Sequence, residues 1–194
     1  MEQDIWFIKQ IESLKTLGFE PKIINEVLKN ATLDRKASLV SKTVKVSLTD
    51  SIMFLSRSPA LANSFTGIYS LIDLPDSVEY EVFARDWFDF VLYPKRKKVG
   101  VKSIDRSFTI SSTHWVPQKE LTEENANMLL ELNSSGKAYK LLVKNAHIPF
   151  VETFKDKKII GVETNNWLFE KDDLRLLIAY GSEIIDNSKK SLRE

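Results

Sequence analysis

The stretch Val44-Lys45-Val46-Ser47-Leu48 alternates apolar and polar residues. This alternation is typical of a β-strand with one dry and one wet face, because successive side chains of a strand point to opposite sides. Val78-Glu79-Tyr80-Glu81-Val82 and Ile148-Pro149-Phe150-Val151-Glu152 repeat the pattern further along the chain. We therefore predict a part of the chain built on an antiparallel sheet, over about residues 39–167.

The segment Phe65–Leu74 is apolar on both of its alternating sides, which is typical of a central strand covered on both faces. Gly67 inside this strand indicates a bulge or a close approach of another group. Shorter apolar segments predict further strands at residues 52–55, 88–92, 99–101, 108–110, 139–143, 148–154 and 159–163. The basic run Lys95–Lys98 is expected to form the tip of a hairpin between two of them.

Helical spacing appears before this block. Residues 2–17 place four apolar residues on one stripe, namely Ile5, Ile8, Ile11 and Leu14. Gly18 is positioned to end this helix as a left-handed cap. Pro21 is a typical first residue of a helix, and the apolar residues after it predict a second helix that ends near Asn30. Residues 1–30 are therefore expected to form a helical hairpin.

Two more helices are predicted after the first strands. Thr122 is a suitable N-cap for a helix that ends before Gly136. The last helix is expected to begin at Asp172 or Asp173 and to share one apolar side, made of Leu174, Leu177, Ile178, Ile184 and Ile185. Gly181 interrupts it at a cost of about 1 kcal/mol relative to alanine.

These elements predict an α+β fold in a single domain over residues 1–194. Its parts are the helical hairpin 1–30, a mainly β part with one helix at 37–167, and the C-terminal helix 171–190. The sheet is expected to be a bent antiparallel sheet or a partial barrel. A pleckstrin-like barrel is the alternative, because about seven strands and a closing amphipathic helix match that design.

The composition of the chain excludes several classes of site and of targeting segment. The chain has 194 residues, a net charge of +1 and no cysteine. The missing cysteine excludes disulfides, thiolate nucleophiles, iron–sulfur clusters and cysteine-based zinc sites. Residues 1–5 carry acids where a secretory signal carries lysine or arginine, and no apolar run approaches the roughly 18 residues of a membrane span. We therefore expect a cytoplasmic protein without a transmembrane segment.

Motifs for cofactor chemistry are missing from the sequence. The six glycines are scattered singly, so no phosphate-binding glycine loop occurs. The two histidines, His114 and His147, are far apart and have no nearby histidine or glutamate in metal-ligand spacing. No cofactor and no metal are therefore predicted.

Two groups of residues have a catalytic interpretation beside a structural one. His114 in Ser111-Ser112-Thr113-His114-Trp115 suggests a hydrolase whose site is assembled from distant segments, but the end of a strand is the favoured interpretation. The acidic residues Glu79, Glu81, Asp86 and Asp89 have the chemistry for a divalent cation or for glycoside hydrolysis. The wet face of a strand and a turn are again favoured, so no catalytic residue is predicted.

The run Lys95-Arg96-Lys97-Lys98 is the candidate contact for an anionic ligand. Four cations on a loop suit a phosphate, an anionic lipid headgroup or RNA, and Trp87 and Tyr93 nearby supply stacking or membrane-interface contact. The alternative is a solvated turn. We expect a non-enzymatic binding or scaffolding module whose partner is an anionic ligand or a protein. A homo-oligomer joined through an apolar edge such as Phe88–Tyr93 is a further possibility.

The order of several short segments resembles a family of uncharacterised bacterial proteins. The segments are Phe65-Thr66-Gly67, Asp73-Leu74-Pro75, Arg106–Ser112, the helix with Leu129-Leu130-Glu131-Leu132, and Leu168-Phe169-Glu170. In that family a Phe-x-Gly strand precedes a Phe-x-Val-Tyr-Ser strand, a helix and a Leu-Phe-Glu segment. This chain has Thr-Ile-Ser-Ser in place of the tyrosine-bearing form. The resemblance implies a bacterial α+β protein and implies no activity or site residues.

Overall fold

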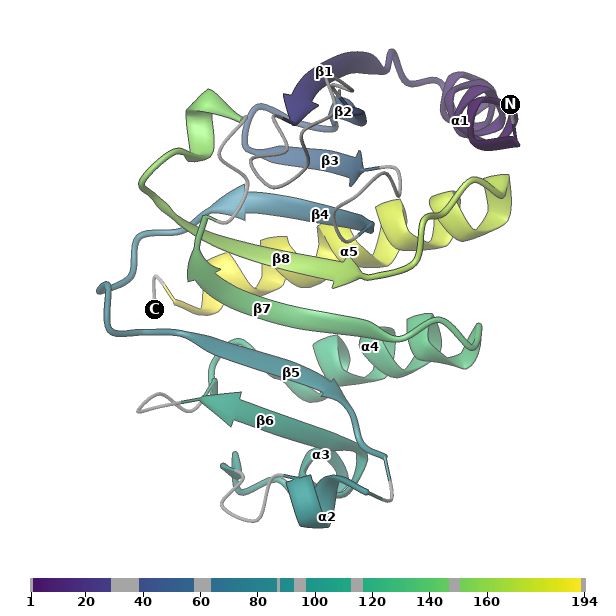
Figure 1. Ribbon diagram of the computed structural model, residues 1–194. Coiled ribbons are helices and arrows are strands. Elements are labelled where there is room, and N and C mark those ends of the chain that lie inside the picture. The colour runs from purple at the N-terminus through teal and green to yellow at the C-terminus, as the bar shows by residue number, and fades with distance from the viewer. Residues whose placement is uncertain are drawn as a thin grey trace, which may run out of the picture.

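The computed structural model describes residues 2–28, 39–57, 64–86, 88–92, 97–112, 117–146 and 151–192. In this part of the chain eight strands form one open sheet, in the order β1-β2-β3-β4-β8-β7-β5-β6 (Figure 1). They are β1 (Lys22–Leu28), β2 (Leu39–Ser47), β3 (Ile52–Arg57), β4 (Phe65–Leu71), β5 (Tyr80–Ala84), β6 (Phe108–Ser112), β7 (Tyr139–Asn145) and β8 (Lys158–Thr164). Every neighbouring pair runs antiparallel. The predicted α+β class is confirmed, and β1 and β6 are free edges, so the sheet does not close into a barrel.

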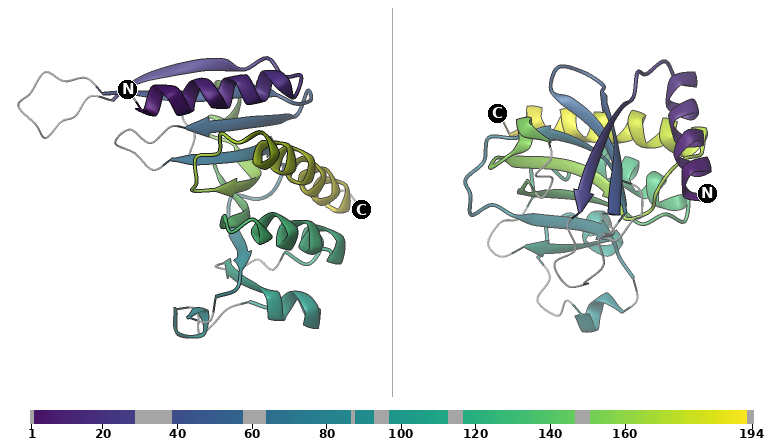
Figure 2. Two further views of the ribbon diagram at one scale, coloured as in Figure 1. Left: turned by 90° about the vertical axis from the view of Figure 1, so that its right-hand side faces the viewer. Right: turned by 45° about the horizontal axis from the view of Figure 1, so that its top comes forward.

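The helices are placed asymmetrically around this sheet. They are α1 (Glu2–Thr16), α2 (Asp89–Leu92), α3 (Lys102–Ser107), α4 (Glu123–Ser134) and α5 (Lys171–Ser191), with a 3-10 turn η1 (Glu152–Phe154). Helices α4 and α5 lie on one face of the sheet, and α1 contacts α5 near the β1 edge (Figures 1 and 2). Helices α2 and α3 lie at the β6 edge. Helices α1 and α2 therefore occupy opposite ends of the molecule.

The main core lies between the sheet and the helices. The predicted C-terminal helix is confirmed as α5, whose buried apolar residues are Leu174, Leu177, Ile184 and Ile185. They belong to the same cluster as Ile68 of β4, and full burial of each such side chain contributes roughly 1.5–3 kcal/mol. A Cβ atom at Gly181 would lie 2.8 Å from Cγ1 of Ile68. The glycine therefore allows α5 to approach β4 closely.

Strand β4 is buried on both faces, as predicted for a central strand. On the face away from α5 a smaller cluster consists of Leu55, Phe65, Tyr69, Val151, Phe154 and Ile159. The ring of Tyr69 lies across two glycines, because a Cβ atom would come within 2.6 Å of it at Gly67 and within 2.5 Å at Gly161. The close approach predicted at Gly67 is confirmed.

The predicted helix caps are also confirmed. Thr122 precedes α4, and its hydroxyl oxygen accepts a hydrogen bond from the backbone N–H of Asn125 at 3.2 Å. Gly136 follows α4 with a φ of 75°, and Gly18 follows α1 with a φ of 89°. Both values lie in the left-handed region that glycine adopts without strain.

Helix α1 buries only part of the predicted stripe, in which Leu14 is buried and Ile11 is partly buried against the core. Phe7, Gln10 and Leu14 are buried, whereas Ile5 and Ile8 are exposed. Gln10 enters the interior because its side chain binds groups of β3 and of the segment before α5. The apolar spacing identified the helix correctly, but it identified the side that faces the protein only in the C-terminal half of the helix.

The predicted second helix, and with it the helical hairpin 1–30, is wrong. Residues 22–28 form strand β1, which pairs with β2 over seven residues from Lys22↔Lys45 to Leu28↔Leu39. Ile23, Ile24 and Val27 are β-branched, and such residues favour strands. A short apolar run of this kind fits the spacing of a helix as well as that of a strand, so the pairing with β2 decides which one forms.

Three other strand predictions differ from the structure. Residues 89–92 form helix α2, and residues 99–101 are irregular and lead into α3. In the predicted strand 148–154, the described residues include the 3-10 turn Glu152–Phe154. The other part of that segment, residues 148–150, lies outside the described residues. The alternation of Phe88, Phe90 and Leu92 resembles a strand, but these residues are not paired in the sheet.

Candidate functional site

The predicted anion contact is only partly described. Lys95 and Arg96 lie outside the described residues, while Lys98 is exposed and Lys97 is half-buried. The backbone N–H of Lys97 donates to the carbonyl oxygen of Ile110 in β6 at 3.4 Å. The described end of the basic run therefore lies beside the free edge of the sheet. It follows α2 and precedes α3, and is not the tip of a hairpin as predicted.

Helix α2 is fastened to the same strand by a buried carboxylate. Asp89 is only 4 % exposed. Its Oδ2 atom accepts hydrogen bonds from the hydroxyl of Thr109 at 2.6 Å and from the backbone N–H of Asp86 at 3.0 Å. Hydrogen bonds to an ionised carboxylate are stronger than those between neutral groups. Since Thr109 and Ile110 are neighbours on β6, α2 and the described end of the basic run lie together on this edge.

This anchoring leaves apolar side chains of and beside α2 in solvent. Phe88, Val91 and Leu92 are 50 %, 61 % and 68 % exposed. Apolar side chains gathered at one place indicate an interaction site, whereas scattered ones are ordinary. We use the name α2 tip for this surface, which consists of Arg85, Phe88, Val91, Leu92, Lys97, Lys98, Val101, Lys102 and Arg106.

The segment that contains the α2 tip is strongly cationic. Residues 85–106 contain seven Lys or Arg and three Asp, a formal charge of +4, while the whole chain carries +1. Two of the three acids, Asp89 and Asp105, accept local hydrogen bonds from neutral groups. Asp105 accepts from the backbone N–H groups of Val99 at 2.9 Å and Gly100 at 3.2 Å, and Asp89 is turned toward β6. Asp89 is therefore the acid whose charge is buried, and the cations of the segment still outnumber its acids at the surface.

The cations of the tip face the solvent. Arg85, Lys98, Lys102 and Arg106 are exposed. In the part of the chain that the structure describes, no carboxylate oxygen lies within 4.0 Å of their side-chain nitrogens. Their charge is thus available to an anion in solution. The basic run is evident from the sequence. The exposed apolar side chains beside it and the burial of Asp89 depend on the fold.

A second group of charges lies across the strands on the face away from α5. Buried Glu163 accepts a hydrogen bond from the hydroxyl of Tyr69 at 2.6 Å, and Lys140 lies 3.6 Å from Glu163 and 2.9 Å from Glu81. Lys144 lies 3.7 Å from Glu81. Burial, and then the charge of Glu163, raise the pKa of Tyr69 well above its ordinary value. These cross-strand pairs stabilise the sheet.

The predicted acidic cluster does not converge on one site. Glu81 forms the ion pairs above, and Glu79 accepts from the backbone N–H of Asn145 at 3.2 Å. Asp86 is exposed, while the carboxylate of Asp89 binds Thr109. Among the described residues no group of three His, Asp or Glu side chains is arranged to hold a metal ion. Both histidines, His114 and His147, lie outside the described residues, so the hydrolase interpretation stays a prediction.

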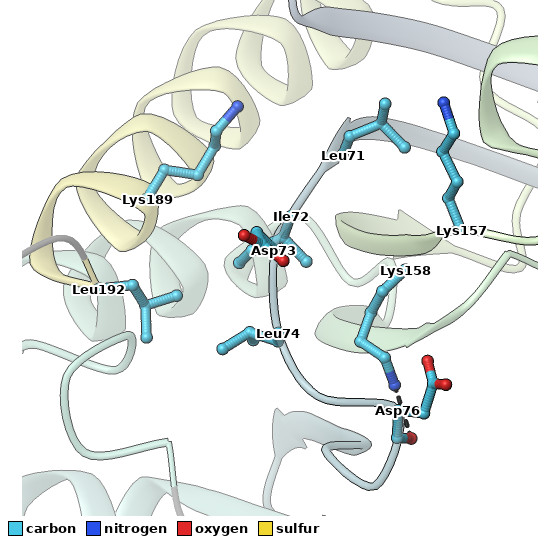
Figure 3. Close-up of a pocket in the computed structure, with 9 residues that line it drawn as sticks. All are labelled: Leu71, Ile72, Asp73, Leu74, Asp76, Lys157, Lys158, Lys189 and Leu192. Carbon is cyan, nitrogen blue, oxygen red and sulfur yellow. Dashed lines mark hydrogen bonds between the residues drawn. The ribbon is translucent and has the colours of Figure 1, made fainter.

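A pocket of about 700 Å³ lies where the β4–β5 connection meets the start of β8 and the end of α5 (Figure 3). Buried Lys158 donates to the carbonyl oxygens of Asp76 at 2.9 Å and Val78 at 2.8 Å. Lys189 donates to the hydroxyl of Ser70 at 2.8 Å. Figure 3 shows the ammonium groups of these two lysines on different sides of the pocket. Lys158 therefore holds the connection and Lys189 joins α5 to β4, so the two do not converge on one anion.

Sequence reasoning missed a buried polar contact between α4 and α5. Asn125 donates to the carbonyl oxygen of Glu120 at 2.7 Å and to the hydroxyl of Ser188 at 3.2 Å. Burial, and then the charge of Glu120, raise the pKa of Tyr80 well above its ordinary value. The hydroxyl of Thr122 caps α4 beside this cluster. The arrangement fixes the two helices, and no pocket opens onto it among those described.

Comparison with family models, with curated proteins and with solved structures finds no match to this chain. The resemblance to uncharacterised bacterial proteins therefore stays a prediction. Among the described residues no helix is both long and apolar enough to cross a bilayer. The function must be inferred from the surface itself.

Proposed function

We propose that this protein is a non-enzymatic binding module that recognises an anionic partner through the α2 tip. The observation that carries the proposal is the separation of charge in residues 85–106. Exposed cations such as Arg85, Lys98 and Lys102 face the solvent, while Asp89 accepts from Thr109 of β6 and Asp105 accepts from backbone N–H groups of its own segment. A solvated turn does not require the carboxylate of Asp89 to be buried.

The distribution of charge over the chain supports the same partner. Residues 85–106 carry +4 and the whole chain +1, so the remaining residues carry −3. A molecule with this asymmetry has its most positive potential at one end. An anionic surface would attract that end and repel the others, which orients the encounter and increases its rate. The lysines around the pocket in Figure 3 have no comparable excess, since Asp73 and Asp76 line it too.

The test is the replacement of the basic run Lys95–Lys98 by four serines. Heparin, a soluble polyanion, is the probe, and affinity is measured by titration at low salt. Each cation near an anionic surface contributes about 1 kcal/mol, so we expect at least about a hundredfold weaker binding. The binding of the unchanged protein should also weaken as salt rises, because salt screens exposed charges.

The matched control removes four cations from other parts of the chain, namely Lys15, Lys22, Lys155 and Lys157, all exposed. This variant has the same net charge as the first one. We expect its affinity for heparin to stay within a few-fold of the unchanged protein and both melting temperatures to change little. Equal losses in the two variants would reject the α2 tip as the contact and leave only a general charge effect.

A further inference from the structure

We infer that the anionic partner is the surface of a lipid bilayer, and that Phe88, Val91 and Leu92 enter its interface. This inference rests on the proposed function and names the partner. The negative headgroups of the bilayer complement the +4 charge of residues 85–106. The acyl boundary beneath them complements the three apolar side chains. A soluble anion satisfies the first requirement only.

The apolar side chains are placed for such a contact. Helix α2 lies at the end of the molecule, beyond the β6 edge and away from α1 (Figures 1 and 2). Phe88, Val91 and Leu92 retain half or more of their surface in solvent there, as given above. A projecting end reaches a flat surface without a clash from the rest of the fold. An apolar patch on a concave face would suit a peptide or small ligand better.

The chemistry of these residues favours lipid over nucleic acid. Surfaces that bind single-stranded nucleic acid use aromatic rings on which bases stack. Val91 and Leu92 are aliphatic and are the most exposed apolar residues of the α2 tip. They have no ring face for a base, whereas burial in the acyl boundary removes their apolar surface from water.

The backbone of α2 limits how deep the tip enters. The backbone N–H groups of Val91 and Leu92 donate to the carbonyl oxygen of Phe88, at 2.9 and 3.2 Å. In a helix this short most backbone groups still need water or polar partners. Such groups are too costly to place in the hydrocarbon core. The tip therefore binds at headgroup depth, where water and phosphate remain within reach.

Two weak contributions combine at this depth. Cations alone or a few apolar side chains alone give reversible, marginal membrane binding, and stable attachment takes two signals together. Lys97, Lys98 and Lys102 supply the first signal, and Phe88, Val91 and Leu92 supply the second. The carboxylate of Asp89 keeps the two groups on one edge of the sheet, so they reach the bilayer at the same time.

The experiment compares two triple variants of the full chain. Phe88→Ser, Val91→Ser and Leu92→Ser are combined in one variant. Ile5→Ser, Ile8→Ser and Ile23→Ser, at the opposite end of the molecule, form the matched control, since those residues are also exposed. Binding is measured by co-flotation with vesicles of phosphatidylcholine and phosphatidylserine at about two to one. Pure phosphatidylcholine vesicles and soluble glycerophosphoserine are the comparison probes, and heparin reports the charge contact alone.

The expected result is specific to the tip. Each substitution should weaken vesicle binding about fivefold to twentyfold, so the tip variant should lose at least about a hundredfold. It should keep its affinity for heparin, and the control should bind vesicles as the unchanged protein does. Soluble glycerophosphoserine should not compete at millimolar concentration, because it has no acyl boundary.

Other results overturn the inference and distinguish it from the proposed function. Unchanged vesicle binding by the tip variant rejects insertion but leaves an anion-binding module. Binding to heparin without any binding of the unchanged protein to anionic vesicles rejects the bilayer and points to an acidic protein or nucleic acid. If replacement of Lys95–Lys98 by serine weakens binding neither to heparin nor to anionic vesicles, the proposed function itself is rejected.

Discussion

The two ends of the molecule expose similar amounts of apolar surface in different electrostatic surroundings. At the α1 end Ile5, Ile8 and Ile23 are 60 %, 54 % and 49 % exposed, close to the values at the α2 tip. Residues 2–28, however, contain three Lys and five Asp or Glu, a formal charge of −2, whereas residues 85–106 carry +4. Apolar exposure alone therefore does not identify the partner, and the surrounding charge distinguishes the two ends.

The two ends also differ in how they are attached. Helix α1 joins a network inside the protein, in which Gln10 binds Ser56 and the carbonyl of Leu168. Helix α2 is held to the edge strand β6 by the buried carboxylate of Asp89, and the described residues show no buried polar network around it like that of Gln10. An end held by an interior network is expected to be more rigid than an end held on an edge strand. Substitutions at the two anchors test this difference.

The largest effect is expected for Gln10→Ala. Gln10 is fully buried and donates to Ser56 at 2.8 Å and to the carbonyl of Leu168, while its oxygen accepts from Trp167 at 3.3 Å. The alanine removes these hydrogen bonds and leaves a cavity, although Ser56 keeps its bond to Thr66 at 3.0 Å, so we expect the free energy of unfolding to fall by about 3 kcal/mol. Urea unfolding measures it. Gln10→Met refills the volume without hydrogen bonds and should recover only part of the loss.

A smaller effect is expected for Asp89→Ala. The substitution removes the acceptor of two hydrogen bonds and leaves the hydroxyl of Thr109 unpaired. We expect a loss of about 2 kcal/mol in the free energy of unfolding, and faster amide exchange in α2 than in α1. Asp89→Asn keeps an accepting oxygen and should restore most of the stability. Exchange that rises equally at both ends would contradict a local anchor.

The sheet and the long helices could be predicted because their patterns are local. The alternation at residues 44–48 and the apolar side of α5 each indicate one structure, and Thr122 binds its partner only three residues away. The β1 strand could not be predicted in this way, since its apolar residues fit a helix as well. Its pairing with β2, from which it is separated by residues 29–38 in the sequence, decides between a strand and a helix.

Of the candidate site, the sequence predicted the positive charge but not the exposed apolar surface. The basic run Lys95–Lys98 can be read directly from the sequence, but the exposure of Val91 and Leu92 cannot. Alternating apolar residues at 88–92 predict a strand whose apolar side is covered. What places them in solvent is the contact of Asp89 with Thr109, twenty residues further along the chain. A contact at that separation depends on the fold of β6 and has no signal in the local pattern.

The smallest effect is expected for Lys9→Ala at the α1 end. Lys9 lies 2.5 Å from Glu170, and the two side chains are 41 % and 54 % exposed. Its ammonium also lies 5.5 Å from the ring centre of Trp6 and 5.2 Å from that of Phe169. Exposed pairs of both kinds contribute about 1 kcal/mol or less, so urea unfolding should show a loss of about 0.5–1 kcal/mol that decreases at high salt.

The same variant sharpens the comparison between the ends. Lys9 is paired with an acid in a region of net negative charge, so its removal should leave vesicle binding unchanged. Lys98→Ala removes one unpaired cation of the α2 tip and should weaken vesicle binding about fivefold. Equal losses for the two substitutions would mean that any lysine contributes to binding. The position of a cation, and not its number, would then no longer explain how this protein recognises an anionic surface.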